Sequence, residues 1–177
     1  DVALDVSLKL GDYIKSNFKE IEVIYTRSDD NFVKLSDRTL IANKAKADLF
    51  ISIHCDAFHN KNVHGTSTFV MGMHKTESNL NVAIRENSSI LMEDNYNSNY
   101  EGFNPSEPES YIALSMYQSS HILNSISFAT KIQKQFKDRV SRKDRGVKQA
   151  GFLVLSRATM PSVLVELGFL TNQSEED

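Results

Sequence analysis

The feature that most constrains the fold is a run of five residues, Leu49-Phe50-Ile51-Ser52-Ile53, in which four side chains are apolar. Because apolar and polar residues do not alternate here, a strand at this position is buried on both faces, as in a parallel sheet covered by helices. A helix predicted over residues 36–46, with Ser36 as its N-cap, leads directly into the run. This succession is typical of an α/β fold.

Other segments extend the same pattern. Apolar residues recur at spacings of three and four from Ala3 to Phe18, which indicates an amphipathic helix. We expect a second long helix over residues 110–137 and further strands at residues 23–25, 66–71, 152–155 and 162–165. The predicted fold is a single α/β domain: a twisted, mostly parallel sheet with helices on both faces and a helical insertion.

Composition excludes several classes of protein. Lys and Arg number 20 against 23 Asp and Glu, a net charge of −3, which argues against a nucleic-acid binder. No apolar run approaches the roughly 20 residues that a membrane span needs. The single cysteine, Cys55, leaves no internal disulfide, and we expect it to be a buried structural thiol.

Charge is distributed unevenly along the chain. Residues 86–130 contain six acidic residues and no Lys or Arg, whereas residues 131–148 carry eight basic residues against two aspartates, a net charge of +6. The acidic stretch falls in a segment, residues 77–120, that we interpret as an insertion into the α/β core. The basic block is a solvated surface, a binding site for a polyanion, or a docking site for the acidic insertion.

Two ionisable residues stand where predicted strands end. His54 follows Ile53, and Glu166 follows Val165. In open α/β sheets, ligands bind beyond the carboxyl ends of the strands. A histidine there can hold a metal ion, and a glutamate with a raised pKa can serve as a base and then as an acid. The alternative for Glu166 is a structural role, capping a helix or pairing with an arginine.

Two longer motifs surround these residues. Residues 52–57 (SIHCDA) with Gly65-Thr66, and residues 161–172 (PSVLVELGFLTN), resemble the two best signatures of the zinc-dependent N-acetylmuramoyl-L-alanine amidases of the amidase_3 family. Scattered residues between Thr26 and Asp48 match the segment before the first signature, and Arg145-Gly146-Val147 matches the segment before the second. The resemblance covers residues 1–72 and 125–174 and leaves out the insertion.

The resemblance implies a peptidoglycan hydrolase that cleaves the amide between N-acetylmuramic acid and the L-alanine of the stem peptide. In the family, two His and one Glu hold zinc, and a second Glu is catalytic. His54 matches a metal ligand and Glu166 matches the catalytic residue. The chain begins inside its first helix, so we expect it to lack an N-terminal strand and to be truncated, with the remaining His and Glu ligands upstream of Asp1. This fragment alone is then expected to be inactive.

The other histidines are weaker candidates for the metal site. His59 and His64 fall in a loop, and we expect these two and His74 to be surface residues. His121 lies in a helical pattern and is expected to pack or to face solvent. Arg38 and Asn43 also match positions of the family. The simplest interpretation is that their side chains cap or pair with groups around the strand ends.

Part of the insertion also carries a resemblance. Residues 80–87 (LNVAIREN) with Asp94 resemble the inserted helical segment of the Gram-negative, cell-division type of these amidases. There the insertion can cover the zinc and place a glutamate on it until an activator protein displaces it. Glu86 matches that glutamate, which makes residues 77–120 a regulatory insertion. The alternative is a helix whose acidic residues are simply solvated.

Two other functions remain open at this stage. One is a non-catalytic module that has lost its metal and binds peptidoglycan or an envelope protein, and the other is a zinc hydrolase of similar fold that acts on a different amide. The retained Glu166 disfavours the binding module, because such a module has no chemical need for it. A peptidoglycan substrate implies an extracytoplasmic, periplasmic location. The net charge of −3 argues against a nucleic-acid partner.

Overall fold

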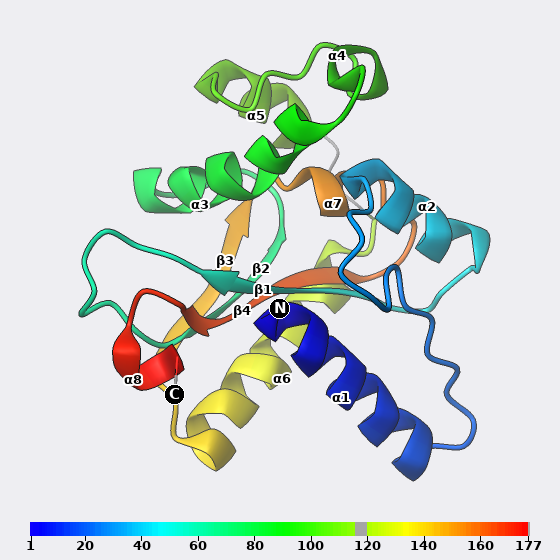
Figure 1. Ribbon diagram of the computed structural model, residues 1–177, viewed down its shortest axis with the longest axis vertical. Helices are drawn as coiled ribbons and strands as arrows, with labels where there is room; N and C mark the ends of the chain where they lie inside the picture. Colours follow the sequence, from blue (N-terminus) through cyan, green and yellow to red (C-terminus); the bar gives the residue numbers. More distant parts are fainter. Residues whose placement is uncertain (116–119, 177) are drawn as a thin grey trace.

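The computed structural model describes residues 1–115 and 120–176. In this part of the chain one four-stranded sheet crosses the molecule (Figure 1). Its strands, in the order β1-β4-β2-β3 across the sheet, are β1 (Phe50–Asp56), β4 (Ser162–Phe169), β2 (Thr66–Met71) and β3 (Asp144–Ala150). Strand β1 runs parallel to β4 and β2 parallel to β3, whereas β4 and β2 are antiparallel. The prediction of an α/β domain with a mostly parallel sheet is confirmed.

Helices cover both faces of this sheet (Figure 1). On one face, α6 contributes Ala129 and its neighbours to a cluster with Val70, Val163 and Val165, and α1 lies on the same side. On the other face, α2, α3 and α7 pack over Phe69 and Leu164. The helices are α1 (Val2–Asn17), α2 (Leu35–Lys44), α3 (Glu77–Asn87), η1 (Ser88–Met92), α4 (Tyr96–Asn99), α5 (Pro108–Ser115), α6 (Ile122–Val140), α7 (Leu153–Ser156) and α8 (Gln173–Glu176).

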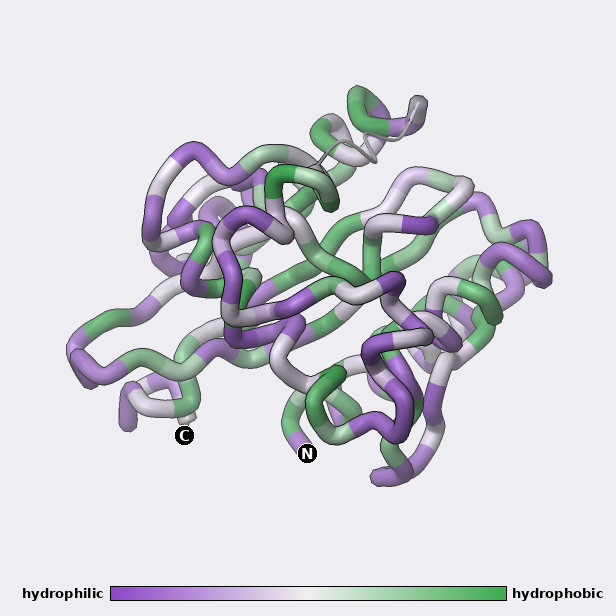
Figure 2. Tube along the Cα trace, turned by 90° about the horizontal axis from the view of Figure 1, so that it is seen from above, coloured by the Kyte–Doolittle hydropathy of each residue, from purple (hydrophilic) through white to green (hydrophobic). Residues whose placement is uncertain are grey.

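The central strands are apolar for the reason that the sequence indicates. Successive side chains of a strand point to opposite faces, so a strand covered on both faces needs apolar residues at nearly every position. In β4, Val163 and Val165 contact the α6 side and Leu164 contacts the α7 side. Figure 2 shows long hydrophobic stretches where the chain crosses the middle of the molecule.

The strand predicted at residues 23–25 is wrong. This segment is irregular and lies against α1, where the Tyr25 hydroxyl donates to the Leu8 carbonyl at 3.4 Å. The ring of Tyr25 comes so close to Gly11 that a Cβ at that position would collide with it. The apolar run therefore packs on the surface of a helix instead of pairing with a strand.

The strand predicted at residues 152–155 is also wrong. Those residues form a buried helical turn, α7, and the strand in this region is β3, just before it. A short apolar run fits a buried helical turn as well as a strand, and periodicity does not separate the two. Strand β3 was missed because its sequence, DRGVKQA, is polar, as an edge strand tolerates.

Two helix boundaries differ from expectation. Helix α2 begins at Leu35, so Ser36 is not its N-cap, and the Leu35 N–H is instead bound by the carboxylate of Glu93, 58 residues away. The helix predicted over residues 110–137 is divided into α5 and α6; the part of that prediction that falls on residues 116–119 lies outside the described residues. None of the helices described is long and apolar enough to cross a bilayer.

Candidate active site

The sheet places His54 beside Glu166. Strands β1 and β4 are parallel neighbours, and these two residues are direct partners in the register. Both side chains point to the face that α3 covers, where Glu86 joins them. Ligating atoms of His54, Glu86 and Glu166 all lie within 4.8 Å of one another. Three residues singled out from the sequence, more than 100 positions apart at the extremes, thus meet in one cluster.

His54 is held on both sides of its ring. Its Nδ1 lies 2.6 Å from Oε2 of Glu86, and its Nε2 lies 3.0 Å from the hydroxyl of Ser52. The Glu86 side chain is 17% exposed, so it is not a solvated surface acid. Burial alone would raise the pKa of Glu86, but the hydrogen bond and charge of His54, helped by Arg85, lower it below its usual value.

Glu166 has the opposite environment. The residue is 1% exposed, and neither carboxyl oxygen has a hydrogen-bond partner. Burial raises its pKa well above the usual value, and the nearby carboxylates of Glu86 and Asp56 add to the effect, which Arg85 and Lys148 only partly offset. A buried carboxyl group without partners costs folding free energy, so its presence needs a reason other than stability.

Sequence reasoning missed three charged residues around this cluster. Asp56 ends β1 and is buried, and Arg85 forms an ion pair with it and donates to the carbonyl of Ala57 at 3.1 Å. Burial raises the pKa of Asp56, and Arg85 counteracts this. Lys148 of β3 is the third. Asp56 and Arg85 stood inside the quoted motifs, next to His54 and Glu86, which was the available signal.

Helix α3 and the turn after it are anchored firmly to the core. Asn87, 1% exposed, donates to the Gly151 carbonyl at 2.8 Å and accepts from the Leu153 N–H at 2.9 Å. Ala83 and Ile90 are fully buried in the main apolar cluster. Three successive residues of α3 therefore reach three parts of the core: Arg85 the end of β1, Glu86 the ring of His54, and Asn87 the connection from β3 to α7.

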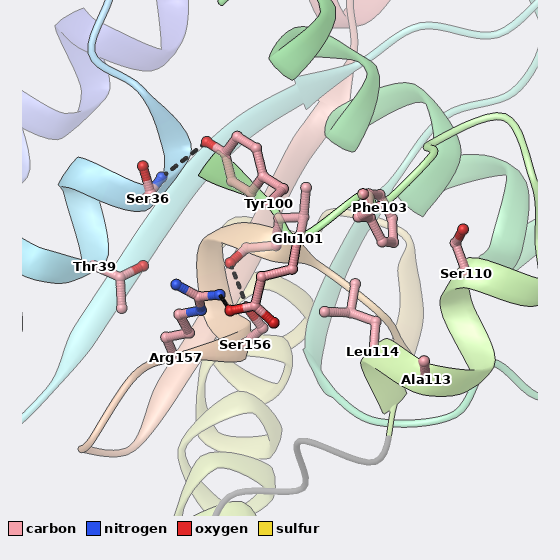
Figure 3. Close-up of a pocket in the computed structure, with 12 residues that line it drawn as sticks. Ser36, Thr39, Tyr100, Glu101, Phe103, Ser110, Ala113, Leu114, Ser156 and Arg157 are labelled. Atoms are coloured by element: carbon pink, nitrogen blue, oxygen red, sulfur yellow. Dashed lines mark hydrogen bonds and ion pairs between the residues drawn. The ribbon is translucent and has the colours of Figure 1, made fainter. Parts of the chain in front are cut away.

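A separate pocket of about 270 Å³ lies away from the cluster, between α2, α7 and the α4–α5 segment (Figure 3). Leu114 and Leu153 contribute apolar lining, and the Glu101–Arg157 ion pair, at 2.8 Å, lies on its rim. On another side the Tyr100 hydroxyl accepts from the Ser36 N–H at 3.2 Å. These contacts join the segment after α4 to α2 and to the end of α7.

The remaining candidates lie outside the cluster. His59 and His64 are exposed, His74 is half-buried, and His121 directly precedes α6. Cys55 is half-buried, and burial followed by the charge of Glu166 raises the pKa of its thiol. Arg38 and Asn43 make structural hydrogen bonds to the carbonyls of Val33 and Arg157, as expected.

The residues of the cluster fit a divalent metal. Zinc accepts imidazole nitrogen and carboxylate oxygen, and His54, Glu86 and Glu166 offer both within a small volume. The unpartnered oxygens of Glu166 are the observation that supports this fit, because a buried polar group without a partner is expected where a ligand or substrate binds. His54 is the one histidine that the described residues bring to the cluster.

Comparison with known proteins identifies relatives of this chain. AmiA of Escherichia coli strain K12, an N-acetylmuramoyl-L-alanine amidase, is 33% identical over 159 residues, which are 88% of this chain and 53% of that protein. AmiC of E. coli O6:H1 strain CFT073 is 31% identical over 181 residues, covering 99% and 41%. The chain thus spans about half the length of these relatives or less.

A solved structure and a family profile extend the comparison to the whole chain. The N-acetylmuramoyl-L-alanine amidase from Clostridium difficile 630 has a TM-score of 0.65 and 26% identity, covering 98% of this chain and 68% of that one. The profile of the Amidase_3 family, described as N-acetylmuramoyl-L-alanine amidase, matches residues 1–177. The fold, the residues that meet at the end of β1 and β4, and this match lead to one conclusion: the chain belongs to the Amidase_3 family.

Proposed function

We propose that the full-length protein hydrolyses the amide between N-acetylmuramic acid and the L-alanine of the peptidoglycan stem peptide. The observation that carries this proposal is the pairing of His54 with a buried Glu166 whose carboxyl oxygens have no partner. Strongly perturbed carboxyl groups in such positions are typical of catalytic sites. The substrate lies outside the cytoplasm, so the protein acts there, in the periplasm of a Gram-negative cell.

Zinc is the proposed cofactor. His54 is one ligand, and the remaining His and Glu ligands are proposed to lie upstream of Asp1, because the described residues supply no second histidine to the cluster. When bound, zinc would lower the pKa of its water molecule to about 7 and would polarise a carbonyl group. The fragment from Asp1 to Asp177 alone is accordingly expected to be inactive.

Glu166 is the proposed proton carrier. A carboxyl group whose pKa is moved toward neutrality can take a proton from the attacking water and later give it up. The water oxygen forms a bond to the lactyl carbonyl carbon, the carbon–nitrogen bond of the amide breaks, and the proton ends on the amino group of L-alanine. Both products leave without any covalent bond to the protein.

Glu86 is proposed to inhibit the site. Its carboxylate lies 2.6 Å from Nδ1 of His54, within the group of side chains that could hold a metal ion. Residues 77–120 then form a regulatory insertion, and an activator protein that binds the displaced form of α3 shifts the population toward an open site.

The replacement Glu86→Ala in the full-length protein tests this role. We expect a several-fold increase in basal amidase activity, measured as peptide released without an activator. The matched control is Glu77→Ala, which removes an exposed carboxylate from the same helix and leaves activity unchanged. Unchanged or lower activity in Glu86→Ala would mean that Glu86 is a permanent part of the site and not an inhibitor.

The binding module without catalysis is the weaker candidate. A protein that only grips peptidoglycan gains nothing from a buried carboxyl group that destabilises its fold. Assays of binding and peptide release on purified sacculi distinguish the two functions. We expect the zinc-loaded full-length protein to release stem peptides with a free L-alanine amino terminus. The Glu166→Gln variant should bind sacculi without releasing stem peptides. Binding by the wild-type protein with no peptide released would support the module instead.

A further inference from the structure

Lys148 is a lysine near the site to which the proposed mechanism gives no role. It lies in β3 opposite Phe69 of β2, with its ammonium 5.4 Å from the centre of the Phe69 ring. The side chain is half-buried, and within the described residues it forms no ion pair. It belongs to the basic block of residues 131–148, whose other lysines are all exposed: Lys131, Lys134 and Lys137 on α6, and Lys143 just before β3.

The register of the sheet places Lys148 on the same face as the cluster. Ser67 of β2 pairs with Glu166, and Phe69, two residues further, pairs with Lys148. Residues two apart in a strand point to the same face. Burial and then the charge of Arg145 lower the pKa of Lys148, and the charges of Asp56 and Glu166, with which it forms no ion pair, partly offset this.

Strand spacing limits what this ammonium can reach. Strands β4 and β3 are separated by β2, so their backbones are roughly 10 Å apart at about 4.8 Å per strand. A lysine side chain spans only part of that distance toward Glu166. The ammonium therefore lies at the margin of the site, beside the reacting atoms and not among them.

The side chains at this end of the site are largely acidic. Asp56 lies beside Glu86 and Glu166, so an anionic substrate meets three carboxyl groups there. Arg85 is already paired with Asp56, whereas Lys148 has no carboxylate partner in the described part of the chain. An unpaired, half-desolvated ammonium beside an acidic cluster is suited to bind a carboxylate of the ligand.

We propose that Lys148 is a substrate-positioning residue that binds a carboxylate of the stem peptide beside the scissile amide. This inference rests on the proposed function, because it takes the substrate from it. The ion pair compensates the repulsion between the acidic cluster and the peptide, and it fixes the register of the peptide across β2 and β3. The alternative is a purely structural lysine that covers Phe69.

Binding measurements on the full-length protein separate these roles. All variants carry Glu166→Gln, so the effect of this replacement cancels between them. Calorimetry then compares the affinity for N-acetylmuramoyl-L-alanyl-D-glutamate with the affinity for its uncharged diamide. We expect Lys148→Met to weaken binding of the acid about tenfold and to leave the diamide within about twofold, since only the ion pair is lost. Lys148→Arg keeps most of the affinity for the acid. The control Lys134→Met, on an exposed part of α6, changes neither.

Other outcomes overturn the inference. An equal loss for the acid and the diamide indicates a structural role, and an unchanged affinity for the acid shows that Lys148 does not touch the substrate. With active enzyme, the account expects an increased KM with a nearly constant kcat; a loss confined to kcat would contradict it. Absence of hydrolysis by the wild-type protein would refute the proposed function but leave the binding comparison intact.

Discussion

Two glutamates near the end of β4 have opposite surroundings. Glu175 in α8 accepts from the N–H groups of Gly65 and Phe169, each at 2.8 Å, and from Arg142 at 2.6 Å. Burial would raise its pKa, but the two backbone hydrogen bonds and the charge of Arg142 lower it. Glu166, in the strand that contains Phe169, has no hydrogen-bond partner and a raised pKa.

Glu175 is a carboxylate that stabilises the fold, whereas Glu166 is one whose oxygens remain available for catalysis. Glu175 ties the end of β4 to the start of β2, so its oxygens are fully used. Glu166 is buried more deeply, and the unfavourable charges of Glu86 and Asp56 are only partly offset by Arg85 and Lys148. Buried polar groups without hydrogen-bond partners are expected at functional sites. Replacing each of the two glutamates separately tests the comparison.

The largest expected effect is on catalysis. Glu166→Gln in the full-length protein should lower kcat by about 10²- to 10⁴-fold, the usual contribution of a general acid–base group. Glu175→Gln should stay within about threefold of wild type, because Glu175 lies outside the cluster and an amide oxygen still accepts one of the two backbone hydrogen bonds. Both are measured as peptide release from sacculi at saturating zinc. Comparable losses in the two variants would remove the distinction between the glutamates.

The next effect is on stability and concerns Glu175. Glu175→Ala should lower the free energy of unfolding by about 2 kcal/mol, since two backbone N–H groups and Arg142 lose their acceptor. Urea denaturation measures it, with Glu77→Ala on the surface of α3 as the control. A change below about 0.5 kcal/mol would show that solvent replaces these hydrogen bonds.

The smallest effect is a pH-dependent gain from Glu166→Gln. The folded-state pKa of Glu166 lies above its unfolded-state pKa. Above pH 4.5 the unfolded chain therefore loses this proton more readily than the folded chain, which lowers the free energy of unfolding. Glutamine does not titrate, so the metal-free variant should be more stable than wild type at pH 8, with the gap closing toward pH 5. Glu175, whose pKa is lowered, loses its stabilising contribution as pH falls. Denaturation across this range measures both, and a gap independent of pH would contradict the assignment for Glu166.

The sequence was informative where burial leaves few alternatives. The runs before His54 and Glu166 are apolar at nearly every position, which predicted two doubly buried strands with ionisable ends. Their adjacency follows from parallel pairing, and the register then places the two side chains together. The contact of Glu86 with His54 came from a motif resemblance and not from periodicity, because α3 is remote in sequence from β1.

The failures have physical causes as well. Strand β3 is polar because an edge strand is only partly covered, and residues 152–155 are apolar because a buried helical turn also needs such residues. The start of α2 is capped by Glu93, which directly follows η1 and lies 58 residues away in the sequence, so no local pattern reveals it. The role proposed for Lys148 depends on strand order, which places β3 two strands from Glu166.

The most direct test of the account is the position of zinc in crystals of the full-length protein, located by anomalous scattering at the zinc edge. The account predicts one ion at about 2.0–2.1 Å from a ring nitrogen of His54, on the side of the sheet where Glu166 lies. An occupied zinc site that does not touch His54, in a protein that releases stem peptides, would contradict it.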